Sequence, residues 1–336
     1  MRVANGEEVH HGDRLCEHGA CDNGAYFVVR SPLDGRSAYL CGVHRKKRPL
    51  EDTWALPKRS KTELALRAQA TRVAHDATVE QAAVERKGAA GPISLFRMRM
   101  LKSPGLLAGV LNIYPNFKHG GRTDGFGCPS LSPMSLGPVR HGQPDLPPAA
   151  NIENFHQLAG KCWREECIAA ETPLVLEDYP GAPVNSSSAT GPRLRPGPLY
   201  ATNRLAGLLN PTPQRHKYRS SEDAKNPNVP VCFVWVDKQR KEHLLTYVHS
   251  RQFYCTFYSR LASLQPAFQQ LLQWRAEGKA LRICGYDGFP IDESRQTFEQ
   301  AYLDPSVPFG HERVLCCMLR LPEVHWPWLK YKTFDF

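Results

Sequence analysis

The pattern of apolar and polar residues predicts helices and strands in no regular alternation. Strand-like apolar runs occur at AYFVVRS (25–31), SAYLCG (37–42), GVLNIY (109–114), VPVCFVWVD (229–237) and ALRICGYDG (280–288). HLLTYVHSRQFY (243–254) predicts either a further strand or the approach to a helix. Helical spacing occurs at 61–87, 151–169, 253–264, 266–278 and, as the final helix, 310–321. The chain is therefore expected to contain both helices and strands.

Residues 61–87 are rich in Ala, Glu, Arg and Gln and contain neither Gly nor Pro, which predicts one long helix that stops at Gly88. We expect this helix to connect a small N-terminal module to the main domain. Its predicted apolar stripe consists of Leu66, Ala70, Val73, Ala77 and Val84.

Two segments rich in Pro and Gly interrupt the pattern. Ser103–Ala150 also carries many large apolar side chains, which a disordered linker lacks, so it predicts ordered, irregular backbone that lines a site. Residues 180–230 form a second such stretch, and its centre, NSSSATGPRLRPGP (185–198), is typical of a flexible insertion. The aromatic C-terminal tail, PEVHWPWLKYKTFDF, predicts a strap packed on the domain.

Length and charge narrow the class of protein. With 336 residues, no long apolar run and no apolar leader, the sequence predicts a soluble intracellular protein, cytoplasmic or nuclear, without a membrane partner. The formal net charge is +10, and residues 45–61 hold seven Lys or Arg against two acids. This cluster fits a nucleic-acid contact, a nuclear address or a solvated linker.

The cysteines suggest one metal site. Cys16, Cys21, Cys41 and His44 have spacing suited to four tetrahedral ligands at the ends of a hairpin, with His18 as an alternative ligand. Four protein ligands indicate a structural zinc ion rather than a catalytic one. The later cysteines, in apolar segments, are expected to act as buried hydrophobic side chains: Cys232, Cys255, Cys284, Cys316 and Cys317.

The candidate chemistry centres on the helix predicted over 151–169. Glu153, Gln157 and Lys161 follow one another at i, i+4 and i+8, opposite an apolar face formed by Ile152, Phe155, Ala159, Cys162 and Trp163. The polar stripe is either a solvated face or the wall of a ligand site. Asn151 is a favourable N-cap. An acid in the first turn is kept ionised by the helix dipole, as a water-activating base requires.

Further candidates lie downstream. Asp287 follows a predicted strand, where functional carboxylates are frequent, although Asp-Gly is also a common turn pair. The helix start behind Gly310 suits an anion. Arg215, His216 and Lys217 fit a phosphate clamp or an ordinary surface loop. The glycine-rich motif HGGRTDGFG (119–127) matches neither a P-loop nor a dinucleotide fingerprint.

Taken together, LSPMSLGPV (131–139), NIENFHQLAGK (151–161), LRICGYDG (281–288) and PFGHERVLCCML (308–319) resemble the NADAR family. The resemblance implies an α+β domain that hydrolyses N-glycosidic bonds in ADP-ribose-like and riboflavin-pathway metabolites. Glu153, Gln157, Lys161, Asp287 and Gly310 match the family's functional positions. The chain departs from the family at Pro133, where the family has Asn, and at Phe289 and Pro290, where it has Trp-Gly. These departures leave the substrate open.

From about Phe96 onward, PNFKH, DGFGC and SRQFYC also resemble uncharacterised proteins of large algal DNA viruses and protists, which imply no activity. The expected layout is a zinc module at 10–50, a basic linker and helix at 51–94, and a NADAR-like domain at 95–336. A structural zinc ion is expected, and no redox cofactor is expected. The alternative function is a non-enzymatic zinc-containing adaptor that binds nucleic acid or protein.

In the hydrolase interpretation, Glu153 activates water, and Asp287 stabilises the sugar cation or binds ribose hydroxyls. Lys161 and the Gly310 helix start hold phosphate, and Trp163 or Tyr286 stacks a base. The remaining expected contacts to a phosphorylated ribosyl molecule or an ADP-ribosylated substrate are Asn154, Gln157, Arg215 and Lys217.

Overall fold

The computed structural model describes residues 60–99, 104–181, 192–213 and 230–336, together with the backbone of 27–30, 37–40 and 52–55. The chain divides into two compact units, Met1–Val73 and Ala74–Phe336. Helices and strands occur together, and the strands form separate small sheets, which confirms the α+β class. Among the described residues, the structure has no helix long and apolar enough to cross a membrane.

The described strands of the first unit form an antiparallel sheet. β1 (Phe27–Arg30) pairs with β2 (Ser37–Leu40) on one side and with β3 (Asp52–Ala55) on the other. The predicted hairpin of the first two strands is therefore confirmed. β3 lies inside the basic segment 45–61, whose charge pattern does not indicate a strand.

α2 (Lys61–Glu85) confirms the helix predicted over 61–87. Its start is a capping box, in which Ser60 Oγ accepts a hydrogen bond from the Glu63 N–H at 3.1 Å and Glu63 Oε2 accepts one from the Ser60 N–H at 3.4 Å. Gly88, at a φ of 83°, follows the helix end.

The apolar stripe predicted for α2 is wrong. Leu66, Val73 and Val84 are exposed, and the buried side chains of the helix are His75, Val79 and Ala83. Tertiary contacts set this face: His75 Nε2 lies 3.1 Å from the carbonyl oxygens of both Leu107 and Val110. The second half of α2 is thus an integral part of the main domain.

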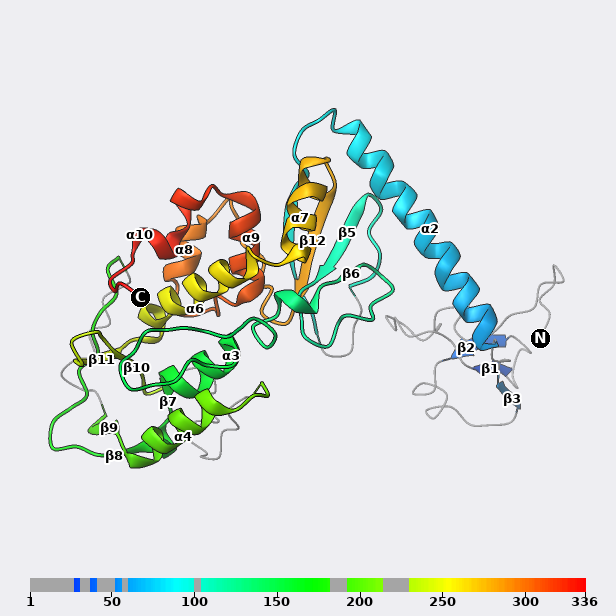
Figure 1. Cartoon of the computed structure of the whole chain (residues 1–336). Helices are drawn as coiled ribbons and strands as arrows, with labels where there is room; N and C mark the ends of the chain where they lie inside the picture. The colour runs from blue at the N-terminus through cyan, green and yellow to red at the C-terminus, as the bar shows by residue number, and fades with distance from the viewer. Residues whose placement is uncertain are drawn as a thin grey trace. The chain divides into compact units, whose positions relative to one another are not determined.

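A parallel sheet has the strand order β4–β12–β5–β6, and β12, β5 and β6 are labelled in Figure 1. Its strands are β4 (Ile93–Arg97), β5 (Val110–Tyr114), β6 (Phe126–Gly127) and β12 (Ala280–Gly285). β12 lies between two neighbours, with Ile283 opposite Leu95 and Ile113, which explains its nearly continuous apolar run. The carboxyl end of β12 leads directly into Tyr286 and Asp287.

A second sheet is antiparallel, in the order β11–β10–β7. Its strands are β7 (Lys161–Cys162), β10 (Cys232–Val236) and β11 (Glu242–Leu245). β10 confirms the strand predicted over 229–237. β11 and the helix that follows it show that HLLTYVHSRQFY holds both the end of a strand and the start of a helix.

The described part of the 180–230 segment is ordered, so the prediction of a flexible insertion is wrong for residues 192–198. β9 (Leu194–Pro196) pairs with β8 (Cys167–Ala169), and α4 (Pro198–Leu209) follows, with Pro198 in its first turn. Tyr200 anchors α4, because its buried hydroxyl donates to the Ala159 carbonyl at 2.7 Å. Composition alone does not reveal such an anchor.

Five helices complete the second unit: α6 (Tyr247–Ala262), α7 (Pro266–Ala276), α8 (Phe298–Leu303), α9 (His311–Arg320) and α10 (Pro327–Lys330). Short 3₁₀ turns lie at η1 (Pro129–Leu131), η3 (Arg164–Glu166) and η4 (Glu323–His325). α6, α7 and α9 confirm three predicted helices. α9 is not the final helix, since α10 follows it within the aromatic tail.

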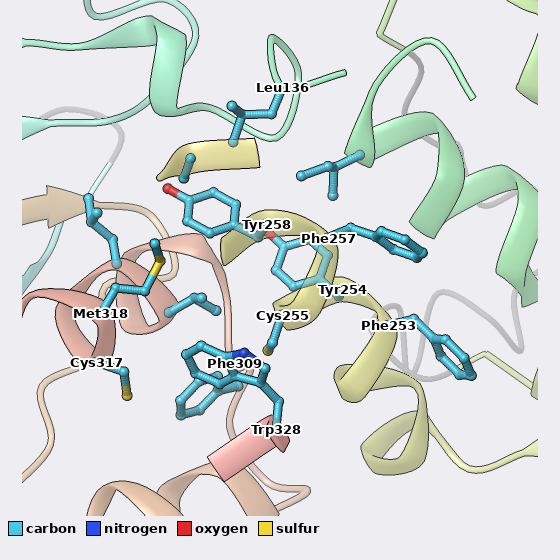
Figure 2. Close-up of a cluster of buried hydrophobic side chains, with 14 of the residues drawn as sticks. Leu136, Phe253, Tyr254, Cys255, Phe257, Tyr258, Phe309, Cys317, Met318 and Trp328 are labelled. Atoms are coloured by element: carbon cyan, nitrogen blue, oxygen red, sulfur yellow. The ribbon is translucent and has the colours of Figure 1, made fainter. Parts of the chain in front are cut away.

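The core lies around α6, which is buried along nearly its whole length. Figure 2 shows its side chains among those of α9, α10 and the segment before α9: Tyr254, Cys255, Phe257, Tyr258, Phe309, Cys317, Met318 and Trp328. The predicted burial of the later cysteines is confirmed for all five. The predicted strap also packs on the domain, with the Phe336 ring 4.9 Å from that of Phe253.

Candidate functional site

The predicted site helix begins as expected and ends early. Asn151 Oδ1 accepts a hydrogen bond from the Asn154 N–H at 2.9 Å, which confirms the N-cap of α3 (Ile152–Asn154). The chain continues as a π-helix, η2 (Phe155–Gly160), and then enters β7. The helix predicted to reach residue 169 is wrong beyond Gly160, because Lys161 and Cys162 pair with β10 instead.

The predicted polar stripe is a chain of contacts in which Glu153 and Lys161 are buried and Gln157 is partly buried. Gln157 Nε2 lies 3.5 Å from Glu153 Oε1, and Lys161 Nζ donates to Gln157 Oε1 at 3.2 Å. Glu153 is only 7% exposed and Lys161 only 6%. The alternative of a solvated helix face is therefore wrong. The apolar residues predicted on the opposite face are also buried.

Lys161 is the positively charged residue of this group, and the charges of two carboxylates act on it. Burial lowers the pKa of Lys161 to about 8, while the carboxylates of Glu153 and Asp287 act to raise it. The ammonium nitrogen lies 5.3 Å from the ring centre of Tyr247 and 5.7 Å from that of Trp163. The fold thus places Asp287, in the turn after β12, close enough to Lys161 for their charges to interact, as it does Glu153.

Asp287 is presented by a turn at the end of the parallel sheet. The Gly288 N–H donates to the Gly285 carbonyl at 3.2 Å, so Tyr286 and Asp287 are the two central residues of the turn. Both side chains are exposed. The two interpretations of the Asp-Gly pair, turn and functional position, are therefore compatible in this structure.

Glu312, in the first turn of α9, is a site residue that the sequence analysis missed. It is fully buried, and its Oε2 lies 3.2 Å from His311 Nδ1. Burial raises the pKa of Tyr254, and the negative charges of Glu153 and Glu312 add to this effect. Tyr254 therefore lies within electrostatic range of both carboxylates. An acid in a helix first turn is common, which is why the pattern alone does not single it out.

The start of α9 is lined by carboxylates. A Cβ atom placed on Gly310 would lie 2.8 Å from Asp287 Cβ, 3.4 Å from Asp287 Oδ2 and 3.2 Å from Glu312 Oε2. An anion at this helix start would therefore meet negative charge, which opposes the phosphate-binding role expected for Gly310. The same charges favour a positively charged group near Asp287.

The other predicted contacts fall into three groups. The Asn154 amide donates to the carbonyls of Asn210 and Thr212 at 2.9 and 3.0 Å, which gives it a structural role. Trp163 is buried beside Lys161, whereas Tyr286 is 42% exposed, so only the latter presents an open ring. Arg215 and Lys217 lie outside the described residues.

The predicted zinc ligands Cys16, Cys21, Cys41 and His44 also lie outside the described residues, as does most of the basic segment 45–61. Across the ranges that the structure describes, His, Cys, Asp and Glu side chains form no group of three or more suited to a metal ion. No family model matches the chain, and neither a curated protein nor a solved structure matches it.

Proposed function

We propose that the second unit hydrolyses an N-glycosidic bond to ribose in an ADP-ribose-like or ribosyl-nucleotide substrate. The observation that carries this proposal is the convergence of Glu153, Lys161 and Asp287, from two distant parts of the chain, into one electrostatic group. Cleavage of such a bond builds positive charge on the sugar ring, and paired carboxylates stabilise that charge.

Each residue has a defined task in the proposed step. Glu153 accepts a proton from the water that attacks C1′ of the ribose. Asp287, at the exposed turn, stabilises the developing sugar cation. Lys161 is mostly protonated at pH 7, because burial lowers its pKa only to about 8, and it donates a proton to the departing base nitrogen.

The atoms balance in this scheme. The bond from C1′ to the base nitrogen breaks, and a bond from C1′ to the water oxygen forms. One proton moves from water to Glu153, and one moves from Lys161 to the nitrogen of a departing purine or pyrimidine; the nicotinamide of NAD leaves as a neutral molecule without this second transfer. Exchange with solvent restores both residues. The role of Lys161 differs from the expected phosphate contact because its buried nitrogen donates to Gln157 and is influenced by the negative charges of Glu153 and Asp287.

The proposal extends to the fold and to the N-terminal module. The order of Glu153, Gln157, Lys161, Asp287 and Gly310 along the chain supports a NADAR-like domain over 95–336. The paired spacing of Cys16, Cys21, Cys41 and His44 supports a structural zinc ion. We expect about one zinc per chain after dialysis, and a loss of zinc in Cys41→Ser; unchanged zinc content would contradict this site.

The hydrolase proposal is tested by incubating the full chain with NAD, ADP-ribose, ADP-ribosylated DNA and pyrimidine ribosyl phosphates. Mass spectrometry detects the free base or, for the modified DNA, free ADP-ribose. We expect Glu153→Gln and Asp287→Asn to slow base release by about a hundredfold or more. Glu171→Gln, at an exposed carboxylate elsewhere in the same unit, is the matched control and should leave the rate unchanged.

Base release that is absent, or that Glu153→Gln does not slow, contradicts the proposal. Nucleic-acid binding that weakens with salt, without any release of base, would favour the adaptor function instead.

A further inference from the structure

The glycine-rich motif HGGRTDGFG (119–127) lies beside the turn that carries Asp287. The His119 ring is 5.9 Å from the Tyr286 ring, at a tilt of 53°. His119 also meets Tyr114 edge-on, with ring centres 5.8 Å apart. Just before the motif, Asn116 Nδ2 donates to the Cys284 carbonyl at 3.2 Å. The loop is thus attached to the end of β12.

The loop is also held by contacts of its own. Arg122 Nε donates to Asp124 Oδ1 at 2.7 Å, and the Tyr114 hydroxyl donates to Asp124 Oδ2 at 2.9 Å. A Cβ atom on Gly127 would lie 2.2 Å from the His119 carbonyl oxygen, so the backbone passes there only with glycine. These contacts fix the position of His119 relative to Tyr286, and they explain the glycine and the Arg–Asp pair of the motif by their structural roles.

The two rings offer a surface suited to an uncharged planar molecule. Burial, together with the positive charge of Arg122, lowers the pKa of His119, so its imidazole is neutral at pH 7. Tyr286 is 42% exposed and directly precedes Asp287 in the turn. The turn therefore presents an exposed aromatic ring and an exposed carboxylate at adjacent positions.

We infer that His119 and Tyr286 form a stacking surface for the purine or pyrimidine base of the substrate. This inference rests on the proposed function and adds to it the residues that select an aromatic leaving group. Stacking on an aromatic side chain tolerates different bases, because every base has a π face. The surface therefore selects a nucleobase as a class rather than one particular base.

Isothermal titration calorimetry of the full chain with AMP, CMP and ribose 5-phosphate tests the inference. Both nucleotides should bind more tightly than ribose 5-phosphate. Tyr286→Leu and His119→Leu should each weaken the binding of both nucleotides by about tenfold and leave that of ribose 5-phosphate within about twofold. Tyr286→Phe keeps the ring and should bind like the wild type.

Phe117→Leu is the matched control, since Phe117 is an exposed aromatic residue in the same segment. Equal affinity for nucleotides and ribose 5-phosphate would overturn the inference. So would an unchanged affinity in Tyr286→Leu, or an equal loss in Phe117→Leu. Nucleotide binding that depends on Tyr286, without base release, would support the surface and contradict the hydrolase. Base release that Tyr286→Leu leaves unchanged would support the hydrolase and contradict the stacking surface.

Discussion

The Glu312 carboxylate lies against the Cα atom of Gly285, at a place where no other residue type fits. A Cβ atom on Gly285 would lie 1.7 Å from Glu312 Oε1 and 2.4 Å from its carboxyl carbon. This contact joins the end of β12 to the first turn of α9. It therefore sets the start of the turn that carries Tyr286 and Asp287.

We expect Gly285→Ala to destabilise the fold and to impair the site. The added methyl group must displace the buried Glu312 side chain, and overpacking of this kind typically costs about 1–3 kcal/mol. Urea unfolding followed by circular dichroism measures the loss. In the base-release assay the rate of the same variant should fall by about tenfold or more, because even a small shift of a catalytic group slows the reaction strongly.

Gly121→Ala is the control for this substitution. A Cβ atom on Gly121 would meet nothing within 4 Å, so neither stability nor activity should change. A Gly285→Ala protein as stable and active as the wild type would show that Glu312 does not hold the turn.

The buried ammonium of Lys161 predicts a pH dependence of stability. Burial lowers its pKa from 10.5 to about 8, so between these values the unfolded chain binds the proton more than the folded chain does. Stability contributed by this group therefore rises with pH through that window. Below pH 8 Lys161 is protonated in both the folded and the unfolded protein, so the burial of its charge destabilises the fold to its full extent.

Comparison with Lys161→Met isolates this effect, because the variant lacks the titrating group. The unfolding free energy of the wild type minus that of the variant should rise between pH 8 and about pH 9.5, by at most about 1.4 kcal/mol per pH unit. Urea unfolding at a series of pH values measures it. A flat difference would mean that Lys161 keeps an ordinary pKa in the folded protein, and a falling difference would mean that folding raises its pKa; either result contradicts the prediction.

The sequence predicted the order of elements better than their burial. Glu153, Gln157 and Lys161 were recognisable as a stripe, yet their spacing fits an exposed helix face as well as a buried one. Their burial depends on the fold around them, including the pairing of Lys161 with β10. A strand of two residues has no periodicity to detect, so the predicted helix ran too far.

Long-range contacts account for the other differences. His75 is buried in α2 because its Nε2 lies against the carbonyl oxygens of Leu107 and Val110, before and at the start of β5. The more apolar Leu66 and Val73 stay exposed. The sequence pattern does not identify Glu312 as a site residue, because acidic residues are common near helix starts. Its position becomes informative only once β12 brings Gly285 and Asp287 beside it.

We expect Glu166→Ala to loosen the segment that follows Lys161. The buried Glu166 carboxylate accepts hydrogen bonds from the Trp163 N–H at 2.9 Å and from Asn203 Nδ2, on α4, at 2.8 Å. Truncation removes the acceptor of two donors, which should lower the unfolding free energy by about 2–3 kcal/mol. Thermal unfolding measures this, and Glu171→Ala, at an exposed position, should be neutral. Equal stability of the two variants would contradict the anchoring role.

The aromatic tail should contribute to stability through Phe336. Its ring lies 4.9 Å from that of Phe253 and 5.4 Å from that of Trp235, and Arg260 Nη1 donates to its carbonyl at 2.9 Å. Phe336→Ala should lower the unfolding free energy by about 1–2 kcal/mol, because the ring is only half-buried and its loss leaves part of the core open to water. Phe336→Leu, which keeps most of the apolar area, should lose less than half of that. Urea unfolding distinguishes the variants, and an alanine variant as stable as the wild type would mean that the tail does not pack on α6 in solution.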